Sequence, residues 1–418
     1  MVTITDIRAR RVWDSRGLPT IEVEIRSETG KTTRAIAPAG ASTGRREAVA
    51  LVDGGPVLGG KDVTHALRQM SDVLYPALVG ITVESQKQFD RALLEAGGPE
   101  SSSPVGANTT TAASLAMTHL FAQEAGVAPW QILGDTPTTL PRPQIQIMGG
   151  GAHAAHRVAV QDFMVHPLSA TCISDAFIQA AEVYRAVGDI LAARGHNSGV
   201  ADEGGHWPDV SDTEEALDTI VQGITRAGLK PGVDMGICLD IAATQFYKDG
   251  HYVVGDKTYT AKEWVTELAS MSSAFPIVSV EDPVHEDHEQ AMVWAVSQCP
   301  AVIVGDDYLV TNPKRIEEVP NGSVEAALIK VNQIGTVTEA HDAVVASRKR
   351  GLGIIVSARS GETEDVSVAH LATGWQADML KVGSITRGER TAKWNELLRI
   401  SEALGNLPMA DVLSKPGL

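Results

Sequence analysis

Six short apolar runs in the second half of the chain each end at a polar or charged residue: GICLD (236–240), PIVSVED (276–282), AVIVGD (301–306), AALIK (326–330), IIVSAR (354–359) and MLK (379–381). The polar positions are 240, 281, 306, 330, 359 and 381, so the first interval spans 41 residues and the others span 22 to 29. Each interval can hold one helix, one strand and two loops. Continuous apolar runs are typical of parallel strands buried on both faces, and barrels of such units carry their chemistry at the carboxyl ends of the strands. The pattern predicts one rim that collects three carboxylates, two lysines and an arginine.

The segments before these runs predict the start of the barrel and a domain in front of it. Alternating apolar and polar side chains joined by glycine-containing turns indicate an antiparallel meander over 3–12, 19–26 and 33–37. Helical periodicity follows over 62–95, 105–124, 174–193 and 213–227. Strand-like runs at 143–148 and 158–165 follow each other closely and predict a hairpin, and a further short strand is expected near 198–202.

The Pro- and Gly-rich stretch GVAPWQILGDTPTTLPRP marks the boundary between two domains. We expect an N-terminal α+β capping domain over residues 1–132. Over residues 140–418 we expect an α/β barrel of eight strands with an irregular antiparallel start.

Composition excludes several classes of protein. The chain of 418 residues has a formal net charge of −17 and no basic stripe, which argues against a nucleic-acid surface. No apolar stretch reaches the roughly 18 residues of a membrane helix, and the N-terminus lacks an apolar signal-peptide core. The three cysteines, Cys172, Cys238 and Cys299, have no metal-like spacing and indicate reduced thiols in a cytoplasmic protein.

Three of the six strand ends carry a carboxylate: Asp240, Glu281 and Asp306. Converging hard oxygen ligands suit Mg²⁺, which keeps positions for water and substrate. Any one of these residues alone is more often a solvated loop acid or a helix N-cap, but three at matched positions favour a metal site.

Lys330 and Lys381 belong to the same rim. A lysine near a divalent cation and a second ammonium group should have a lowered pKa, which would make it a base at neutral pH. The alternative is an ordinary surface lysine. For Lys330 this alternative is weak, because the residue ends the predicted buried strand AALIK.

Other polar residues could serve an anionic substrate. Glu203, before Gly204 and Gly205, is a candidate general acid, although DEGG alone is only a turn. Asp162 interrupts an apolar strand and is expected at the barrel mouth, and His153 lies in a Gly-rich loop where a histidine is more often structural. His156 and His206 are interpreted as surface residues.

Residues that could clamp a phosphoryl group are Arg359 and Ser360. The loop GASTG at 40–44 could close over the barrel mouth.

Taken together, these segments resemble the enolase (phosphopyruvate hydratase) family. The resemblance covers almost the whole chain and rests on ordered motifs: DSRGLPT, GASTG, GGAH, VQDFM, DEGG, QFYKDG, VED, GDDYLVTN, IKVNQIGT, RSGETED and KVGSITRGERTAKWNELLRISEALG. It implies a lyase that removes water from a 2-phosphoglycerate-type substrate through an enolate, with two Mg²⁺ ions per active site.

The resemblance also implies a role for each matching residue. Lys330 would remove the proton α to the carboxylate, and Glu203 would protonate the leaving hydroxyl. Asp240, Glu281 and Asp306 would hold the first Mg²⁺, while substrate phosphate and Ser42 would hold the second. Lys381 would bind the substrate carboxylate, and Arg359 and Ser360 its phosphate. Family members form dimers or higher homo-oligomers.

The chain departs from the family pattern at several positions. Ala358 stands where the family has histidine, in SARSGET, and Asp162 stands where it has glutamate. Leu18 replaces the usual asparagine of DSRGNPT, and His206 and Trp207 replace small or apolar residues. Two of the changes remove bulk while the ligands, base and phosphate clamp remain, which favours elimination chemistry on a substrate with a larger group on phosphorus, as in the enolase-like synthases of phosphonate antibiotic pathways. The alternatives are an ordinary enolase that tolerates the changes and a non-catalytic enolase-like binding protein.

Overall fold

The computed structural model describes residues 1–41, 43–97 and 104–414. The first part contains a four-stranded sheet of order β3-β2-β1-β4, built from β1 (Val2–Trp13), β2 (Pro19–Ser27), β3 (Thr32–Ile36) and β4 (Thr82–Val83). The predicted antiparallel meander is confirmed. Strand β2 places Ile21, Val23 and Ile25 in the core. A turn held by Asp14 joins β1 to β2, because its Oδ1 accepts hydrogen bonds from the backbone N–H groups of Arg16 and Leu18.

The helical periodicity predicted over 62–95 is not one continuous helix. It is divided into α1 (Thr64–Gln69), a π-helical turn η2 (Met70–Leu74), α2 (Tyr75–Leu78) and α3 (Gln86–Gly97). The chain leaves the helix at Val79, which is extended, and turns at Gly80 with φ 90°, so that β4 can pair with β1. Glycine adopts positive φ without steric cost, which explains the break at this point.

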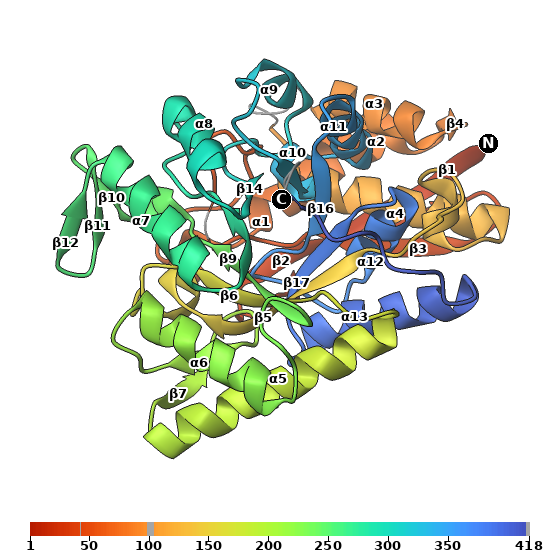
Figure 1. Cartoon of the computed structure of the whole chain (residues 1–418). Coiled ribbons are helices and arrows are strands. Elements are labelled where there is room, and N and C mark those ends of the chain that lie inside the picture. Colours follow the sequence, from red (N-terminus) through yellow and green to blue (C-terminus); the bar gives the residue numbers. More distant parts are fainter. Residues whose placement is uncertain (42, 98–103, 415–418) are drawn as a thin grey trace.

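The predicted helix over 105–124 is α4 (Ala107–Ala125), which ends at Gly126 in the left-handed region. Its residues are buried almost all round because it packs against β2 and β3 and also against α10 and α11. A helix that is buried on nearly every face occupies an interior position. Helix α4 therefore joins the N-terminal sheet to the second part of the molecule (Figure 1).

The second part is a closed barrel of eight strands: β5 (Arg142–Gly149), β6 (Asp162–Pro167), β9 (Met235–Asp240), β13 (Ile277–Glu281), β14 (Val302–Gly305), β15 (Ala326–Ile329), β16 (Gly353–Ser357) and β17 (Met379–Ser384). Strand β6 is antiparallel to both β5 and β9, the others run parallel, and β17 pairs with β5 to close the ring. The predicted eight-stranded barrel with an irregular antiparallel start is confirmed.

Helices surround the barrel: α5 (Ile173–Arg194), α6 (Thr213–Arg226), α7 (Ala261–Ala274), α8 (Glu289–Gln298), α9 (Pro313–Glu318), α10 (Val331–Ile334), α11 (Val337–Lys349), α12 (Ser367–Gly374) and α13 (Gly388–Ala403). Several begin at side-chain caps, which fix where each loop ends. The Thr260 hydroxyl and the Glu263 carboxylate form a reciprocal capping box at α7. Short 3₁₀ turns lie at η1 (Val57–Gly60), η4 (Pro129–Ile132), η5 (Gly151–Ala154) and η6 (Ala243–Phe246).

Two small additions extend the barrel. Strands β7 (Asn197–Val200) and β8 (His206–Pro208) form a hairpin that pairs with β5, and the predicted strand near 198–202 is β7. An antiparallel sheet of β10 (Tyr247–Lys248), β11 (His251–Val254) and β12 (Lys257–Tyr259) projects at one side of Figure 1. This sheet was not predicted, although the 41-residue interval between residues 240 and 281 signals an insertion there.

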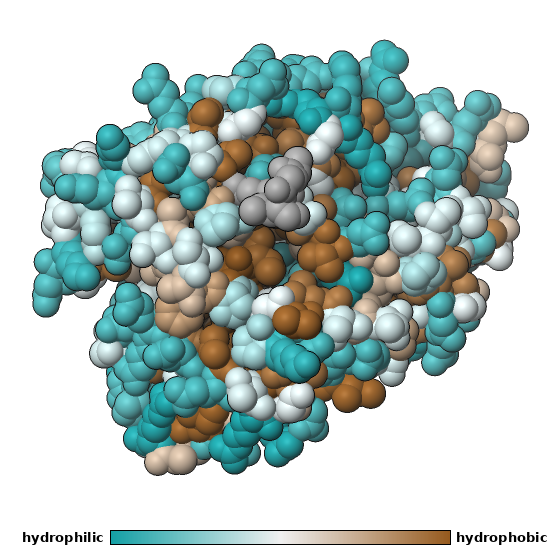
Figure 2. Space-filling view, viewed as in Figure 1, coloured by the Kyte–Doolittle hydropathy of each residue, from teal (hydrophilic) through white to brown (hydrophobic). Residues whose placement is uncertain are grey.

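The C-terminal segment covers the end of the barrel at which the parallel strands begin. Met409 pairs with Leu140, and Leu413 packs on the apolar cluster of β14, β15, β16 and β17. Figure 2 shows this segment's side of the molecule, where hydrophobic residues gather near the middle and hydrophilic residues dominate the periphery. Among the described residues, no helix combines the length and the apolar character needed to cross a membrane.

Candidate active site

Three acidic residues on neighbouring strands lie in one row at the carboxyl end of the barrel. Asp162 on β6 pairs in register with Asp240 on β9, and Asp240 pairs with Glu281 on β13. Asp306 follows β14 directly, and all four carboxylates are buried. The strand ends therefore bring the predicted acidic residues to the same rim, as expected for parallel strands.

Lysine side chains lie between the predicted metal ligands. The Nζ of Lys381 lies 3.0 Å from Asp240 Oδ2 and 2.7 Å from Glu281 Oε2, and the Nζ of Lys330 lies 2.5 Å from Asp306 Oδ2. Lys381 lies within β17 rather than at its end, since that strand continues to Ser384. Its ammonium group reaches the neighbouring carboxylates across the barrel mouth.

The lowering of the Lys330 pKa was predicted for a lysine beside a bound divalent cation, and without that cation the chain gives the opposite direction. Burial has the largest single effect and lowers the pKa of Lys330, but the negative charges of the nearby carboxylates, Asp306 and Glu281, together raise this pKa above its usual value. For Lys381 the charges of Asp240 and Glu281 outweigh burial in the same way and hold its pKa well above the usual value. Both lysines are ammonium ions in this arrangement, and their charge offsets that of the rim carboxylates.

The compact groups of potential metal ligands among the described residues differ from the predicted trio. One contains Asp282, Asp306 and Asp307, with ligand atoms within 4.8 Å of one another. Asp282 accepts hydrogen bonds from the backbone N–H groups of Asp306 at 3.0 Å and Asp307 at 2.7 Å, so it joins the ends of β13 and β14. Burial and the charge of Asp306 raise the pKa of Asp282 to about 8.

The predicted trio nevertheless has the character of a cation site. Glu281 Oε1 is buried and has no hydrogen-bond partner within the described part of the chain. A buried carboxylate oxygen without a partner costs free energy unless a cation or donor binds it. Burial and the nearby charge of Asp240 also raise the pKa of Glu281 well above its usual value, which a divalent cation would reverse. The residues present therefore fit Mg²⁺.

A second group joins His153, Asp162 and Glu203. His153 Nδ1 lies 2.8 Å from Asp162 Oδ1, and His153 Nε2 lies 3.9 Å from Glu203 Oε1. Burial lowers the pKa of His153, but the charges of Asp162 and Glu203 outweigh it and raise the pKa to about 9. Burial and the charge of Asp162 raise the pKa of Glu203, which favours a protonated carboxyl group able to donate a proton.

The turn that carries Glu203 is anchored on both sides. Glu203 O accepts a hydrogen bond from Ser384 N at 2.8 Å, and Gly205 N donates to Gln146 Oε1 at 2.8 Å. A Cβ at residue 205 would lie 2.6 Å from that same amide oxygen, so a larger residue would require the Gln146 side chain to move and would disturb this hydrogen bond. The prediction that His206 lies on the surface is wrong. His206 is buried and stacks on Tyr184, with ring centroids 4.1 Å apart. His156 is exposed as expected.

The predicted phosphate clamp, Arg359 and Ser360, follows the end of β16. Arg359 is buried and forms a bidentate ion pair with Glu47, with nitrogen-to-oxygen distances of 2.9 and 3.2 Å. The Ser360 hydroxyl accepts a hydrogen bond from Ala41 N at 2.6 Å, which ties the first domain to the barrel. Ser42 lies outside the described residues.

A small cavity of about 20 Å³ collects most of the predicted side chains: Gly40, Ala41, His153, Gln161, Asp162, Glu203, Asp240, Lys330, Ser357, Ala358, Arg359, Ser360 and Lys381. Glu281 and Asp306 are not among its lining residues, but they contact Lys381 and Lys330, which are. Gln161 was missed by the sequence reasoning, although it directly precedes Asp162 and donates a hydrogen bond to Asp240 Oδ2 at 3.0 Å.

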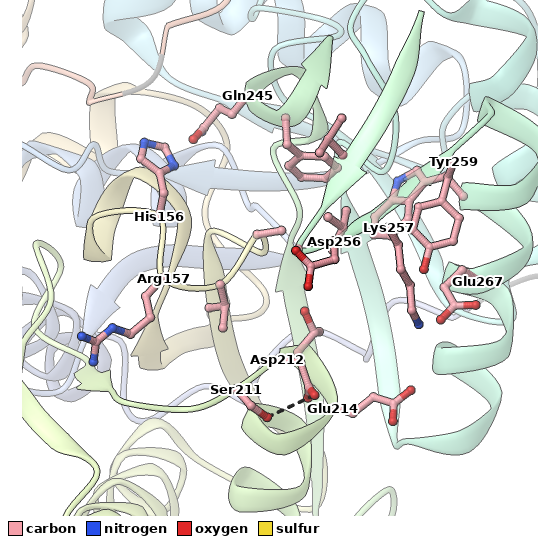
Figure 3. Close-up of a pocket in the computed structure, with 18 of the residues that line it drawn as sticks. His156, Arg157, Ser211, Asp212, Glu214, Gln245, Asp256, Lys257, Tyr259 and Glu267 are labelled. Carbon is pink, nitrogen blue, oxygen red and sulfur yellow. Dashed lines mark hydrogen bonds between the residues drawn. The ribbon is translucent and has the colours of Figure 1, made fainter.

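A larger cavity of about 700 Å³ lies outside this site, between the loop after η5, the start of α6 and the β10–β12 sheet. Figure 3 shows His156 and Arg157 on one side of it and Lys257 and Tyr259 on the other. Gln245 of its wall donates a short hydrogen bond to Gln161, which contacts Asp240. The cavity thus adjoins the candidate site without containing its predicted catalytic residues.

Comparison with known protein families agrees with this geometry. Residues 4–133 match the enolase N-terminal domain, and residues 137–411 match the enolase C-terminal TIM barrel domain. The matches cover almost the entire chain in the family's order. The chain belongs to the enolase family, and as a member it is a hydro-lyase of the enolase superfamily.

Proposed function

We propose that this enzyme eliminates water from a 2-phosphoglycerate-type carboxylate and forms a phosphoenolpyruvate-type product through an enolate. The observation that carries the proposal is that Lys330, Glu203, Lys381 and Arg359 line one cavity. Proton removal, proton donation and anion binding are the three tasks of such an elimination. The protein would act on small molecules in the cytoplasm as a homo-oligomer, with residues 1–132 as the capping domain and 140–418 as the catalytic domain.

In this mechanism the neutral amine of Lys330, which the metal-free chain holds as an ammonium ion beside Asp306, removes the proton α to the carboxylate, and Glu203 protonates the leaving hydroxyl. The raised pKa of Glu203 supports the second role, because burial and Asp162 keep its proton in place. His153 and Asp162 would hold the Glu203 side of the cavity, Lys381 would bind the substrate carboxylate, and Arg359 and Ser360 would bind its phosphoryl group.

Asp240, Glu281 and Asp306 would hold the first Mg²⁺, and Ser42 with substrate phosphate would hold the second. When bound, Mg²⁺ would supply positive charge to the enolate carboxylate and take over the oxygens that Lys330 and Lys381 now contact. Glu281 Oε1, which has no hydrogen-bond partner among the described residues, supports this assignment.

We further propose a substrate with an extra group on phosphorus, as in carboxyphosphonoenolpyruvate synthase of phosphonate antibiotic biosynthesis. Ala358 lines the cavity beside Arg359 and Ser360, so residue 358 contributes only a methyl group to the wall at the phosphoryl end. An ordinary enolase acting on 2-phosphoglycerate is the second candidate. It is favoured by the retained base, acid and phosphate clamp. The convergence of these groups on one cavity argues against a binding protein without catalysis.

The test compares elimination of 2-phosphoglycerate with that of its analogue bearing a carboxyl group on phosphorus. We expect Mg²⁺-dependent exchange of the C2 proton of 2-phosphoglycerate with solvent deuterium, followed by NMR, but slow formation of the enol product. We also expect Ala358→His to raise turnover of 2-phosphoglycerate and to lower turnover of the larger analogue. Turnover of 2-phosphoglycerate at ordinary enolase rates would favour the second candidate, and no exchange on either substrate would reject the elimination chemistry.

A further inference from the structure

The turn that carries Glu203 is also held from outside the cavity, by helix α5 and by the loop after β17. The Tyr184 hydroxyl of α5 donates a hydrogen bond to Gly204 O at 3.1 Å, and the Thr386 hydroxyl donates to the same oxygen at 2.6 Å. Neither hydroxyl belongs to a residue that lines the active-site cavity. Because Gly204 directly follows Glu203, the two hydroxyls fix the backbone next to the candidate acid.

The position of the Glu203 carboxyl group depends on this backbone. Among the described residues no hydrogen bond holds the carboxyl group itself, and His153 Nε2 lies 3.9 Å from Oε1, beyond hydrogen-bond distance. The main chain is held at Glu203 O, which accepts from Ser384 N at 2.8 Å. A side chain that is aimed by its backbone moves with it, so a displaced turn would also displace the proton that Glu203 is proposed to donate.

His206 in turn fixes Tyr184. The two rings stack with centroids 4.1 Å apart and an angle of 19° between their planes, and His206 Nε2 lies 3.0 Å from Tyr184 O. A carbonyl oxygen can only accept a hydrogen bond, so Nε2 carries the hydrogen and donates it. Burial lowers the pKa of His206, which keeps the ring uncharged at neutral pH. The tyrosine is therefore held both at its ring and at its backbone.

Helix α5 has a glycine at the point where the His206 ring meets it. A Cβ added at Gly188 would lie 2.7 Å from His206 Cε1 and 3.0 Å from Nε2, so a larger residue would push the ring away from the helix. Glycine inside a helix lowers stability relative to alanine, and the space that the ring needs explains this one. His206 stands where the chain departs from the enolase pattern, so the stacked histidine is a feature of this chain.

We infer that Tyr184 and His206 are positioning residues that aim the Glu203 carboxyl group at the leaving hydroxyl of the substrate. The inference rests on the proposed function and adds to it two residues outside the cavity. Tyr184 acts through Gly204 O, and His206 acts through Tyr184. In the step concerned, the carbon–oxygen bond breaks and the oxygen leaves as water with the Glu203 proton. A change at either residue should slow this step and leave proton removal by Lys330 intact.

The experiment separates the two steps in the full-length protein with excess Mg²⁺. Proton removal is followed by NMR as exchange of the C2 proton with solvent deuterium. Carbon–oxygen cleavage is followed by the absorbance of the enol product, with protein in excess over substrate so that slow turnover is measurable. The hydroxyl substrate is 2-phosphoglycerate or its analogue with a carboxyl group on phosphorus, whichever the wild type converts faster. The chloride substrate has chloride in place of the leaving hydroxyl, and chloride leaves without needing a proton.

Tyr184→Phe removes one oxygen atom and keeps the ring. We expect enol formation from the hydroxyl substrate to fall about tenfold, because a displacement near 1 Å can cost up to about 10²-fold and Thr386 still holds Gly204 O. The rates of C2 exchange and of chloride elimination should stay at the wild-type level. Tyr75→Phe, at an exposed position of α2, is the matched control and should keep all three rates.

Two further variants disturb Tyr184 through His206. His206→Leu removes both the donor and the stacked ring, and Gly188→Ala pushes the ring away from α5. Each should give the same pattern as Tyr184→Phe with a smaller loss, whereas a merely structural role would lower all three rates together. Thermal unfolding identifies a variant that does not fold, and Tyr184→Phe, which lacks only one atom, then decides.

The inference is overturned if folded Tyr184→Phe forms the enol from the hydroxyl substrate at the wild-type rate, or if it loses equally on both substrates. Glu203→Gln is the reference for the proposed function, and it should lose turnover of the hydroxyl substrate while it keeps that of the chloride substrate. If Glu203→Gln shows this pattern and Tyr184→Phe does not, only this inference fails. If Glu203→Gln keeps the wild-type rate on the hydroxyl substrate, the proposed role of Glu203 fails and the inference fails with it.

Discussion

Buried cationic side chains have different partners at the two ends of the barrel. At the end where the parallel strands begin, Arg142 is buried and donates to the backbone carbonyls of Ala410 at 3.1 Å and Pro167 at 2.8 Å. At the other end, Lys330 and Lys381 contact carboxylates of neighbouring strands. Backbone carbonyls cannot be exchanged for a ligand without unfolding, whereas paired side chains can take a new partner. The end with Arg142, here called the structural end, therefore contributes stability. The end with Lys330 and Lys381, here called the chemical end, is available for chemistry.

The largest effect should follow from removing a charge at the chemical end. We expect Lys330→Ala to lower kcat for C2 proton exchange by about 10³-fold or more, since a positioned general base contributes typically 10²–10⁴-fold. The measurement is NMR-detected exchange in saturating Mg²⁺. Lys349→Ala, at an exposed position of α11, is the control and should keep wild-type exchange. Wild-type exchange by Lys330→Ala would remove this lysine from the mechanism.

Removing a charge at the structural end should change stability instead. Arg142→Met leaves several buried carbonyls without a donor, which should lower the free energy of unfolding by about 3 kcal/mol. Urea denaturation measures the loss, and Arg226→Met at an exposed position should lose far less. We expect the folded Arg142→Met protein to keep its exchange rate. A stable but inactive variant would contradict the division between the two ends.

The structural end should also give stability a pH dependence through His166. Burial lowers the pKa of His166 to about 4, and its Nε2 is buried without a partner among the described residues. The unfolded chain takes up this proton near the ordinary pKa of about 6.5. The neutral ring thus contributes its full stability above pH 6.5, and this is lost as pH falls toward 4, by about 1.4 kcal/mol per pH unit.

Comparing wild type with His166→Gln isolates this contribution. Urea midpoints at pH 7.0 and pH 5.0 should diverge for the wild type and change less for the variant. His65→Gln, at an exposed position of α1, should behave as the wild type. Identical pH dependence in all three proteins would exclude His166 as a source of acid lability.

The smallest predicted effect concerns Glu47, which joins the first domain to the chemical end. Because its carboxylate pairs with Arg359, it competes with any phosphoryl group for that guanidinium. Glu47→Gln should tighten binding of inorganic phosphate about threefold to tenfold by calorimetry. Glu318→Gln, at an exposed position, is the control. Weaker phosphate binding in Glu47→Gln would indicate that Glu47 orders Arg359 for phosphate rather than competing with it.

Sequence predicted the strands better than the insertions. The six apolar runs became β9 and β13 to β17 because burial on both faces leaves a clear signal. The β10–β12 sheet is largely exposed and leaves little hydrophobic pattern, so only the length of its interval marked it. The break after α2 depended on Gly80 and on pairing between β1 and β4, which a local periodicity does not reveal.

For the candidate site, the strand-end rule located the rim but not the partners within it. It placed Asp240, Glu281 and Asp306 at the same edge, as the structure has them. It could not anticipate that Lys381 bridges two of them or that Glu47 holds Arg359, since these pairs join residues at least 100 positions apart. The sequence could not reveal that His206 is buried, because its stacking on Tyr184 depends on how α5 packs beside the turn.

The central claim is that the carboxylates at the chemical end exchange their lysine partners for a divalent cation. Electron paramagnetic resonance of Mn²⁺ titrated into substrate-free protein tests it directly, with Glu281→Gln beside the wild type. Glu267→Gln, on the outer helix α7, is the matched control. We predict about one bound Mn²⁺ per chain in the wild type and the control, and weak or no binding in Glu281→Gln. Equal Mn²⁺ binding by all three proteins, or none by the wild type, would contradict the account.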